Sequence, residues 1–424
     1  MTEAARILSI MCLLAAWGGC SSGPGDDQDS DAGGDVVADD AAGETADPGS
    51  DDGTADKGRD GQDVAADDEG ADAEDEAPPE FDCSAPEGYV NPAPGSTGHT
   101  EIAHWKGDRP AALTISFDDS TPNQLLIAMP AMIARGFTGT YFVNPGTSSY
   151  QIHQDEWETV APANFQELAN HTMDHTGATD YSDAEYQIGE AAGIITSAYP
   201  ASRSPLMGFN NGGGTTWNIT DEEYQALLVE YHCIERLYSS GVYAATPGDT
   251  IFNDTKDHLS SGGVADNWGL MHFHGICDPA DTVNCVCDTP GSTANCREYG
   301  GSVNNGSVKS TDFVAFLDAL VADSYFAQDV WIAGFISTHK YQSERNSSGV
   351  VMVPDTGDRI ALCLSSTLDP ALYDESLTLI TQVPAGWTGC STVQGGAAGN
   401  CIITEGTAVF DALPDRGAVV LSQE

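Results

Sequence analysis

Two adjacent carboxylates follow the first strongly apolar segment of the chain. The run Ala-Leu-Thr-Ile-Ser-Phe at 112–117 has the pattern of a buried strand, and Asp118 and Asp119 come directly after it. Active sites of α/β barrels are built at the carboxyl ends of parallel strands. Because adjacent residues point in different directions, one carboxylate could bind a metal ion while the other acts beside it. Asp-Asp-Ser-Thr-Pro is equally good turn chemistry, so this motif alone leaves both interpretations open.

A pair of histidines offers the ligands that such a metal ion would need. His171 and His175 are four residues apart and follow a stretch with helical spacing, Phe165–Asn170. We therefore expect them on one helix face, where they could chelate a divalent ion. Two histidines and one carboxylate leave coordination positions open for water and substrate, as in catalytic metal sites. Two solvated histidines are the plainer alternative for an isolated pair.

A second histidine pair lies in the apolar segment 268–276. In a strand, His272 and His274 would face the same side, just before a loop. A single histidine in such a strand is usually a hydrogen-bonded core residue, but two on one face favour a functional role.

Alternating strand and helix patterns begin at Ala111 and would position these groups. Short apolar runs predict strands at 112–117, 139–143, 195–199, 268–273 and 330–333. Helical spacing occurs at 122–135, 163–171, 183–196, 220–232 and 311–323, and Thr220 with Glu223 predicts a capping box. This alternation indicates an α/β fold with a parallel sheet, closed or nearly closed. After residue 349 this alternation of strand and helix patterns stops. Short β runs predict an antiparallel domain at 349–424, with strands at 350–353, 360–364, 377–383, 408–410 and 418–421.

The first twenty residues resemble a bacterial lipoprotein signal. The apolar run at 7–17 is too short to span a bilayer as a mature helix, and small residues with Cys20 follow it. We expect cleavage before Cys20, lipidation of that cysteine and anchoring to the outer membrane. An ordinary secretory signal, which would give an extracellular protein, is the alternative.

Acidic residues dominate the composition. The 424 residues include 65 acidic and 15 basic side chains, with a formal net charge of −50. Residues 21–82 are rich in Asp, Gly, Ala and Glu, which predicts a disordered, self-repelling linker. Residues 83–424 still carry −29, which argues against nucleic acid and anionic lipid surfaces as partners. Oligomeric state cannot be read from the sequence.

Nine cysteines follow Cys20, and in an oxidising compartment they predict disulfides. Cys390 and Cys401 flank a glycine-rich turn and could close it. Four others lie between Cys277 and Cys296, where disulfides are favoured over a zinc site because the spacing matches no familiar zinc motif. Nine is an odd number, so one thiol is free or bonded elsewhere.

Four motifs together resemble the metal-dependent polysaccharide deacetylases. They are, in order, Ala-Leu-Thr-Ile-Ser-Phe-Asp-Asp, Gly-Thr-Tyr-Phe-Val, Asn-His-Thr-Met-Asp-His and His-Gly-Ile, within a stretch from about 111 to 347. The resemblance implies a distorted (β/α) barrel of the polysaccharide deacetylase type at 83–348, followed by the sandwich-like β domain at 349–424. It also implies an Asp-His-His site for a divalent metal, usually zinc.

The resemblance assigns roles residue by residue. Asp119, His171 and His175 would bind the metal, Asp118 would act as the base, and His274 would protonate the leaving group. These roles agree with the way carboxylates and histidines divide acid and base work beside a metal ion.

Other positions depart from the family pattern. Ser120 replaces the usual glycine, and His272 stands where relatives often have an apolar residue lining the acetyl pocket, so His272 and His274 could exchange roles. The usual base-orienting arginine is missing near Tyr199, and Arg236 could replace it, with Arg203 as the competitor. We expect His272, Tyr199 and Trp268 to contact the substrate, with Trp217 as a further candidate; burial in the core is the alternative for both tryptophans.

The predicted function is hydrolysis of N- or O-acetyl groups from an acetylated glycan at the cell surface. The alternative from another class is a non-catalytic glycan-binding lipoprotein that keeps the deacetylase fold. A peptidase or phosphoesterase ranks lower, because the sequence has neither a His-Glu-x-x-His motif nor a phosphate-binding glycine loop.

Overall fold

The computed structural model describes residues 81–83, 88–212, 215–231, 234–236, 241–243, 246–261, 265–278, 285–287, 296–298, 307–353 and 358–424. The predicted signal with Cys20 and nearly all of the predicted linker lie outside these residues. From Phe81 to Glu424 the chain belongs to one compact unit. None of the helices in the described part of the chain has the length and hydrophobicity needed to cross a bilayer.

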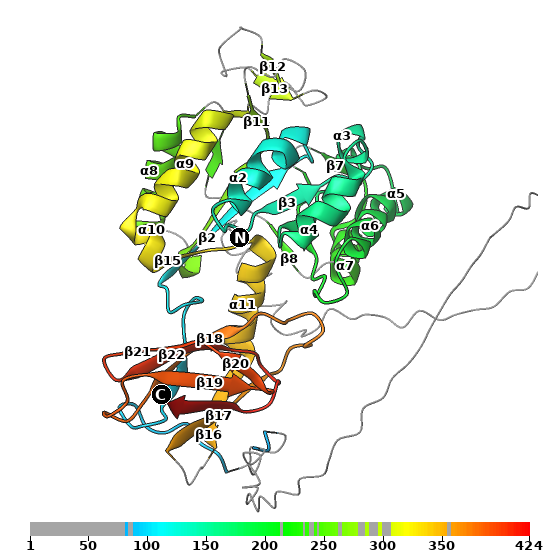
Figure 1. The fold of residues 1–424 in the computed structure, drawn as a ribbon. Coiled ribbons are helices and arrows are strands. Elements are labelled where there is room, and N and C mark those ends of the chain that lie inside the picture. Colours follow the sequence, from blue (N-terminus) through cyan, green and yellow to red (C-terminus); the bar gives the residue numbers. More distant parts are fainter. Residues whose placement is uncertain are drawn as a thin grey trace, which may run out of the picture. The chain divides into compact units, whose positions relative to one another are not determined.

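A curled parallel sheet carries the predicted site (Figure 1). Its strands in spatial order are β8 (Ile234–Glu235), β6 (Gly208–Phe209), β4 (Glu167–Asn170), β3 (Thr140–Val143), β2 (Ala111–Asp118), β10 (Trp268–Phe273) and β9 (Gly241–Tyr243). An eighth strand, β15 (Val330–Ile332), pairs with the first half of β2, and β3 pairs with the second half. Every residue of β2 is buried, as expected for a strand covered on both faces. This arrangement confirms the predicted distorted (β/α) barrel.

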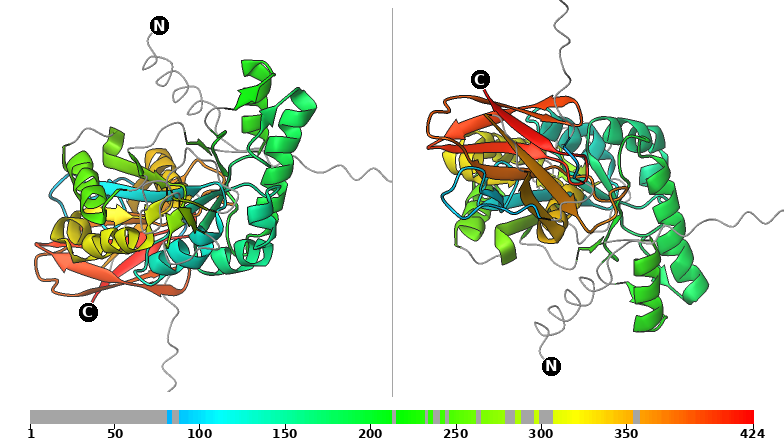
Figure 2. Two further views of the ribbon diagram at one scale, coloured as in Figure 1. Left: turned by 90° about the horizontal axis from the view of Figure 1, so that it is seen from above. Right: turned by 90° about the horizontal axis from the view of Figure 1, so that it is seen from below.

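Helices lie around the outside of this sheet (Figures 1 and 2). They are η1 (Gln124–Ala128), α2 (Met129–Ile133), α3 (Ser148–Gln151), η2 (Glu156–Val160), α4 (Ala161–Ala163), α5 (Tyr181–Glu185), η3 (Tyr186–Glu190), α6 (Ala191–Ser197), α7 (Asp221–Tyr231), α8 (Gly248–Ser260), α9 (Ser310–Ala322) and α10 (Ser324–Asp329). Another helix, α11 (Phe335–Ser347), runs from the parallel sheet toward the antiparallel sheets. A 3-10 turn, η4 (Ala265–Asn267), precedes β10. Four of the five predicted helices are confirmed. So is the capping box, because the backbone N–H of Thr220 donates to Glu223 Oε2 at 2.8 Å and the N–H of Glu223 donates back to Thr220 Oγ1 at 3.2 Å.

Two predicted elements are wrong. The helix expected at 163–171 is strand β4, and the strand expected at 195–199 is the end of α6. The polar residues that suggested an exposed helix face are buried here by contacts from distant segments. Glu167 Oε2 accepts from the N–H of Ile336 at 2.8 Å, and Gln166 Oε1 accepts from the N–H of Gly139 at 2.8 Å.

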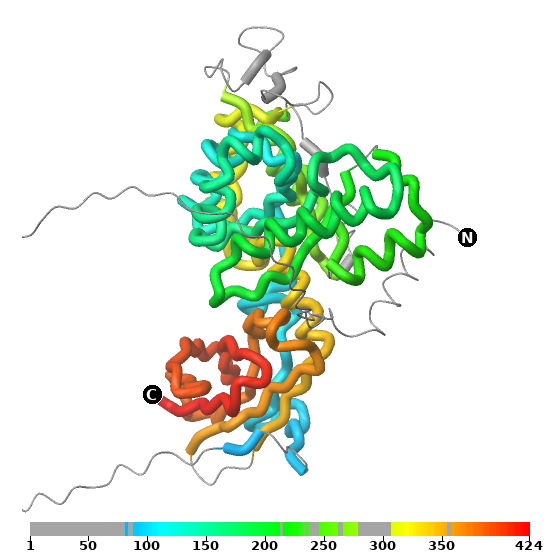
Figure 3. Tube along the Cα trace, turned by 90° about the vertical axis from the view of Figure 1, so that its right-hand side faces the viewer, coloured from blue at the N-terminus to red at the C-terminus, as the bar shows by residue number. Residues whose placement is uncertain are grey.

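Two antiparallel sheets contain all five strands predicted after Gly349. One has the order β1 (Thr100–Ile102), β18 (Leu377–Gln382), β22 (Thr407–Ala412), β21 (Cys401–Thr404). The other has the order β16 (Ser348–Val353), β17 (Arg359–Ser366), β23 (Val419–Gln423), β19 (Cys390–Gln394), β20 (Ala397–Gly399). Both contribute to one apolar cluster that includes Leu362, Leu379, Phe410 and Leu421. Figure 3 shows the early blue segment beside these late orange strands, because β1 precedes the barrel in sequence and pairs with β18.

The remaining strands form three small two-stranded sheets. They are β5 (Gly177–Ala178) with β7 (Thr216–Trp217), β11 (Ile276–Cys277) with β14 (Val308–Lys309), and β12 (Cys285–Cys287) with β13 (Cys296–Glu298).

Disulfides connect the antiparallel region. Cys390 is bonded to Cys401, as predicted, and Cys83 is bonded to Cys363 across 280 positions of sequence. Cys277 is also disulfide-bonded, which removes it from the alternative zinc site; most of the loop that follows lies outside the described residues. Such bonds are typical of exported proteins.

Candidate active site

The end of β2 places the two adjacent carboxylates in different surroundings. Asp118 is the last residue of the strand and is 3% exposed, whereas Asp119 and Ser120 turn the chain sharply with φ angles of 77° and 51°. Left-handed backbone is costly for residues with a side chain. A hydrogen bond helps to hold this turn, since Ser120 Oγ accepts from the N–H of Asn144 at 2.6 Å. The turn directs the two carboxylates to separate partners.

Asp118 forms a buried ion pair with Arg236, which directly follows β8. The guanidinium donates to Asp118 Oδ1 at 2.8 Å and to Oδ2 at 2.5 Å, and it lies 4.1 Å from the ring centre of Phe142. Burial alone would raise the pKa of Asp118, but the charge of Arg236 and then that of His171 hold this pKa well below its usual value. Asp118 is therefore a fixed, ionised carboxylate, a state suited to a base.

Arg236 occupies the place for which two arginines competed. Arg203 instead lies over the rings of Phe165 and Tyr199 and donates to the carbonyl of Pro162 at 3.0 Å. Sequence spacing alone could not decide between them, because the pairing depends on how β8 is placed in the sheet.

Asp119, His171 and His175 form a group that could hold a metal ion. The distance from Asp119 Oδ1 to His171 Nε2 is 3.4 Å and that to His175 Nε2 is 3.9 Å, and one ligand atom from each residue lies within 4.8 Å of the other two. Ligands at ~2.0–2.1 Å from a tetrahedral ion are ~3.3 Å apart. These side chains therefore need only a small adjustment to share one ion.

Hydrogen bonds orient this group toward a common point. His171 Nδ1 lies 3.0 Å from the carbonyl oxygen of Asn210; the imidazole donates there, and its Nε2 faces Asp119 Oδ1. An N–H bonded to a carbonyl in this way is typical of histidines that ligate metals. Burial would raise the pKa of Asp119, but the hydrogen bond and the charge of His171 lower it. The carboxylate is thus ionised and ready to act as a ligand.

The two histidines lie on a loop, so the expected helix is wrong. His171 directly follows β4, and the chain then bends through Thr172 and His175 at φ angles of 70° and 63°. The loop is fixed by its own side chains, since Thr172 Oγ1 accepts from the N–H of His175 at 3.0 Å. The Asn144 side chain donates to the carbonyl oxygens of His171 and Thr172. The four-residue spacing brings the imidazoles together by a turn rather than by a helix face.

His272 and His274 approach Asp118 from the end of β10. Their ring centres are 5.1 Å apart, and together with Asp118 they form a second group whose ligand atoms lie within 4.8 Å. Burial lowers the pKa of His272 to about 4, and Arg236 and His274 add to this against the opposing charge of Asp118. Its Nδ1 is buried without a hydrogen-bond partner among the described residues. His272 is thus a neutral imidazole at neutral pH.

Two expected substrate contacts are not brought to this group. The Tyr199 hydroxyl donates to the carbonyl of Leu168 at 2.7 Å and accepts from the Leu168 N–H at 2.9 Å. Trp268 is the first residue of β10, at the strand end opposite to that of His274, where it packs against Trp105 and donates to Thr114 Oγ1 at 3.0 Å. The plainer alternative, a core tryptophan, was correct for Trp268.

Trp217 has a different position. It is the last residue of β7, which pairs with β5 two residues after His175, and its side chain is partly exposed. Its side chain packs against the apolar cluster that includes Phe209 and Leu227, and its ring centre lies 5.6 Å from that of Tyr224.

Sequence reasoning missed several residues that support the site. Asn144 follows β3 and Asn210 follows β6, so each stands directly after a parallel strand. That position was a usable signal. Gly212 gave none: its φ is 70°, and a Cβ placed there would lie 2.4 Å from His175 Nε2.

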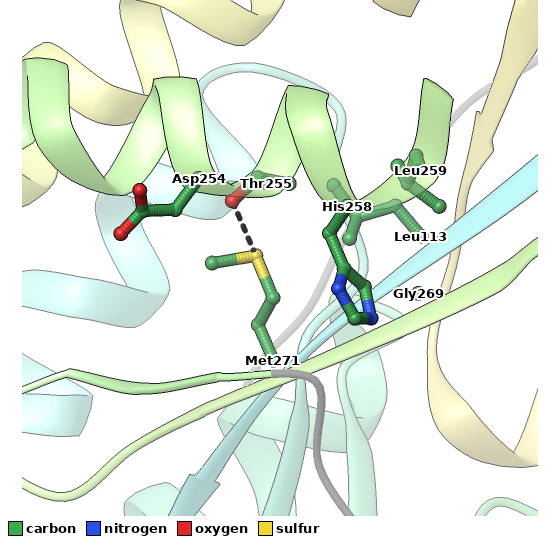
Figure 4. Close-up of a pocket in the computed structure, with 7 residues that line it drawn as sticks. All are labelled: Leu113, Asp254, Thr255, His258, Leu259, Gly269 and Met271. Carbon is green, nitrogen blue, oxygen red and sulfur yellow. Dashed lines mark hydrogen bonds between the residues drawn. The ribbon is translucent and has the colours of Figure 1, made fainter. Parts of the chain in front are cut away.

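A small cavity elsewhere in the barrel does not compete with this site. It lies between α8 and the strands β2 and β10 (Figure 4) and is lined by Leu113, Asp254, Thr255, His258, Leu259, Gly269 and Met271. Its volume is about 10 Å³, room for at most about one water molecule. A sugar does not fit there.

Comparisons with known proteins give distant similarities. No protein-family model matches the sequence. A gellan lyase from Bacillus sp. is 22% identical over 355 residues, which covers 77% of this chain; the chain spans only 13% of that relative's length. A peptidoglycan deacetylase from Bacillus subtilis is similar in structure, with 14% identity over 55% of this chain and 91% of that one, at a TM-score of 0.32. A polysaccharide deacetylase from Bacillus cereus has 13% identity over 53% of this chain and 92% of that one, at a TM-score of 0.33. A CE4-family pseudoenzyme from Bacillus anthracis has 11% identity over 38% of this chain and 54% of that one, at a TM-score of 0.29.

Proposed function

We propose that this chain is a metal-dependent carbohydrate deacetylase that releases acetate from N- or O-acetylated glycans. One observation carries the proposal. Asp119, His171 and His175 converge at coordination spacing directly beside Asp118, a carboxylate that Arg236 holds ionised. The order of the four motifs in the sequence supports the same conclusion.

The donor set suits zinc. Two imidazole nitrogens and one carboxylate oxygen are ligands that Zn²⁺ takes in catalytic sites. When bound, such an ion supplies a Lewis acid that polarises the acyl carbonyl and lowers the pKa of a water molecule toward ~7. Asp119, His171 and His175 would hold it.

The surrounding residues divide the proton transfers. Asp118 accepts the proton of the attacking water, and Arg236 keeps this carboxylate ionised and correctly oriented. His274 donates a proton to the leaving amine or alcohol. His272, half-buried and neutral, contributes a polar wall to the substrate pocket. Amide and ester hydrolysis pass through similar oxyanions, so the same residues serve both reactions.

The location and domain division are part of the proposal. We propose a lipidated Cys20, an acidic linker at 21–82, a catalytic barrel at 83–348 and a sandwich-like domain at 349–424. The antiparallel sheets also take β1 and the Cys83 disulfide from the N-terminal side. The catalytic unit would thus act at the cell surface on an acetylated glycan.

The test measures bound metal and acetate release with the purified chain. Acetylated xylan, chitin oligomers and peptidoglycan are the substrates. Asp119→Ala and His175→Ala should lose metal and activity together, whereas Asp118→Asn should keep the metal and lose activity. His258→Ala, on α8 and outside both histidine groups, is the matched control and should change neither.

Two outcomes would contradict the proposal. A fully active Asp118→Asn variant would remove the assigned base. A wild-type chain with neither metal nor acetate release would favour the non-catalytic glycan-binding lipoprotein.

A further inference from the structure

One buried glutamine connects the two strands that carry the proposed base and acid. Gln124 is the first residue of η1 and its side chain is fully buried. Its Nε2 donates to the carbonyl oxygen of Asp118 at 2.5 Å and to the carbonyl oxygen of His274 at 2.7 Å. An amide NH₂ group has two protons in a fixed planar geometry. Each proton therefore serves one carbonyl.

These two carbonyls lie where the pairing between the strands stops. The register of β2 and β10 ends at Phe117 opposite Phe273. Asp118 continues in contact with β3, but His274 lies beyond the end of β10. Gln124 extends the connection between the two strands beyond their last pair.

Of the two residues that Gln124 connects, His274 depends more on the hydrogen bond from Gln124. Asp118 is held independently by Arg236 and by pairing of its backbone with Phe142. The amide of Gln124 fixes the peptide plane that follows His274, and thus the backbone from which the imidazole projects. A misplacement of about 1 Å at a reacting group can cost ~100-fold in rate.

We propose that Gln124 is a positioning residue that sets the separation between the acid His274 and the base Asp118. This inference depends on the proposed function. A further feature supports it: Gln124 Oε1 is buried without a hydrogen-bond partner among the described residues, a state that normally destabilises a fold. An amide retained there despite this cost is better explained by its two N–H bonds than by packing.

A second buried glutamine provides a matched control. Gln166 Nε2 also bridges two carbonyls, those of Phe137 and Asn164, at 3.1 and 3.2 Å. It lies before β4, at the opposite ends of the strands from the site. Gln124→Met and Gln166→Met therefore each remove an amide that bridges two carbonyls, one at the carboxyl ends and the other at the amino ends of the parallel strands.

The experiment compares two substrates that differ in their need for an acid. An acetylated sugar needs protonation of its leaving group, whereas 4-nitrophenyl acetate releases a stable phenolate without it. Gln124→Met should lower kcat by about 10- to 100-fold on the acetylated sugar and by less than about 3-fold on the aryl ester, with bound metal unchanged. Gln166→Met should leave kcat unchanged on both. If Gln124→Met does not fold, Gln124→Asn, whose shorter amide cannot reach both carbonyls, is used under the same criteria.

A double-mutant cycle completes the test. In a His274→Ala background, Gln124→Met should cost less than about 2-fold further, because the acid that it positions is already absent. Equal losses on both substrates, or full additivity with His274→Ala, would overturn the inference while leaving the proposed function intact. A wild-type chain that releases acetate from neither substrate would overturn both.

Discussion

The carboxyl edge of the parallel sheet and the antiparallel sheets are built on different principles. At the edge, Asp119, Ser120, Thr172 and His175 adopt left-handed backbone, and a charged pair is buried. The antiparallel sheets have an apolar core, and two disulfides join their segments. Buried polar side chains in these sheets pair with each other between neighbouring strands. For example, Thr100 Oγ1 on β1 lies 2.9 Å from Thr381 Oγ1 on β18.

This difference separates the parts of the molecule that provide chemistry and stability. Strained backbone and buried charge persist only where surrounding contacts over-determine them, and such features gather at functional sites. Substitutions at the sheet edge should therefore lower activity, even where they also destabilise the fold. Substitutions in the antiparallel sheets should lower stability and leave activity unchanged.

The largest expected effect comes from removing the arginine of the buried ion pair. Arg236→Met leaves Asp118 buried and unpaired, which should lower kcat at neutral pH by at least about 100-fold and destabilise the fold by about 3–5 kcal/mol. Without the cation, burial raises the pKa of Asp118. The acidic limb of the variant's pH–rate profile should therefore lie at a higher pH than that of the wild-type chain. The pH–rate profile and thermal unfolding measure both effects.

The matched control for this change is Arg203→Met. Arg203 is the competing arginine and packs on Phe165 and Tyr199 away from the ion pair. Its loss should leave the pH–rate profile unchanged. If both variants moved the profile equally, Arg236 would have no special connection to the base.

The opposite region should respond to loss of a disulfide. Cys390→Ser together with Cys401→Ser opens a loop with a sequence separation of 11, and loop-closure entropy predicts a loss of about 3 kcal/mol. Activity below the lowered melting temperature should not change, because the bond lies within the antiparallel sheets. A fall in kcat at 25 °C with metal content preserved would show that the two regions are not separable in this way.

Two glycines with the same backbone strain allow the regions to be compared directly. Gly212 has a φ of +70° and a Cβ there would lie 2.4 Å from His175 Nε2, whereas Gly396 has a φ of +81° and open space around it. Both changes to alanine should cost about 1 kcal/mol of stability. Gly212→Ala alone should also displace His175 and weaken metal affinity by about 10- to 100-fold. Isothermal titration with Zn²⁺ distinguishes the two, and equal affinities would contradict the assignment of His175.

The two regions also differ in how well sequence predicted them. Short apolar runs identified five strands of the antiparallel region, since each pairs with a neighbour of the same simple pattern, whereas β1, β19, β20 and β21 were not predicted. In the barrel, the spacing around Leu168 suggested a helix, because Gln166 and Glu167 are polar and yet buried by hydrogen bonds from Gly139 and Ile336. Those partners are distant in sequence, so no local pattern contains them.

The candidate site shows the same limit. Asp119, His171 and His175 were recognised by residue type and order, although the scaffold assumed for the histidines was wrong. Supporting residues such as Gln124 and Gly212 act through their own geometry rather than through reactive side chains. Motifs therefore identified the groups proposed to react, and only the arrangement of the strands identified what positions them.

A small effect, on stability alone and only above neutral pH, is expected where α11 contacts the antiparallel sheets. Burial raises the pKa of Glu344 to about 8; a hydrogen bond from the Glu375 N–H opposes this shift, while the charges of Glu375 and Asp374 add to it. The folded chain thus holds a proton that the unfolded chain has released, so the stability that this proton provides is lost as the pH rises through 8. The loss between pH 7 and 9 should be about 1.4 kcal/mol, and Glu344→Gln, which cannot ionise, should remove it. Denaturant unfolding at the two pH values measures the difference. If the variant showed the same pH dependence as the wild-type chain, Glu344 would be ionised in the folded chain. Its buried charge would then have to be balanced by Lys340, which pairs with Asp374.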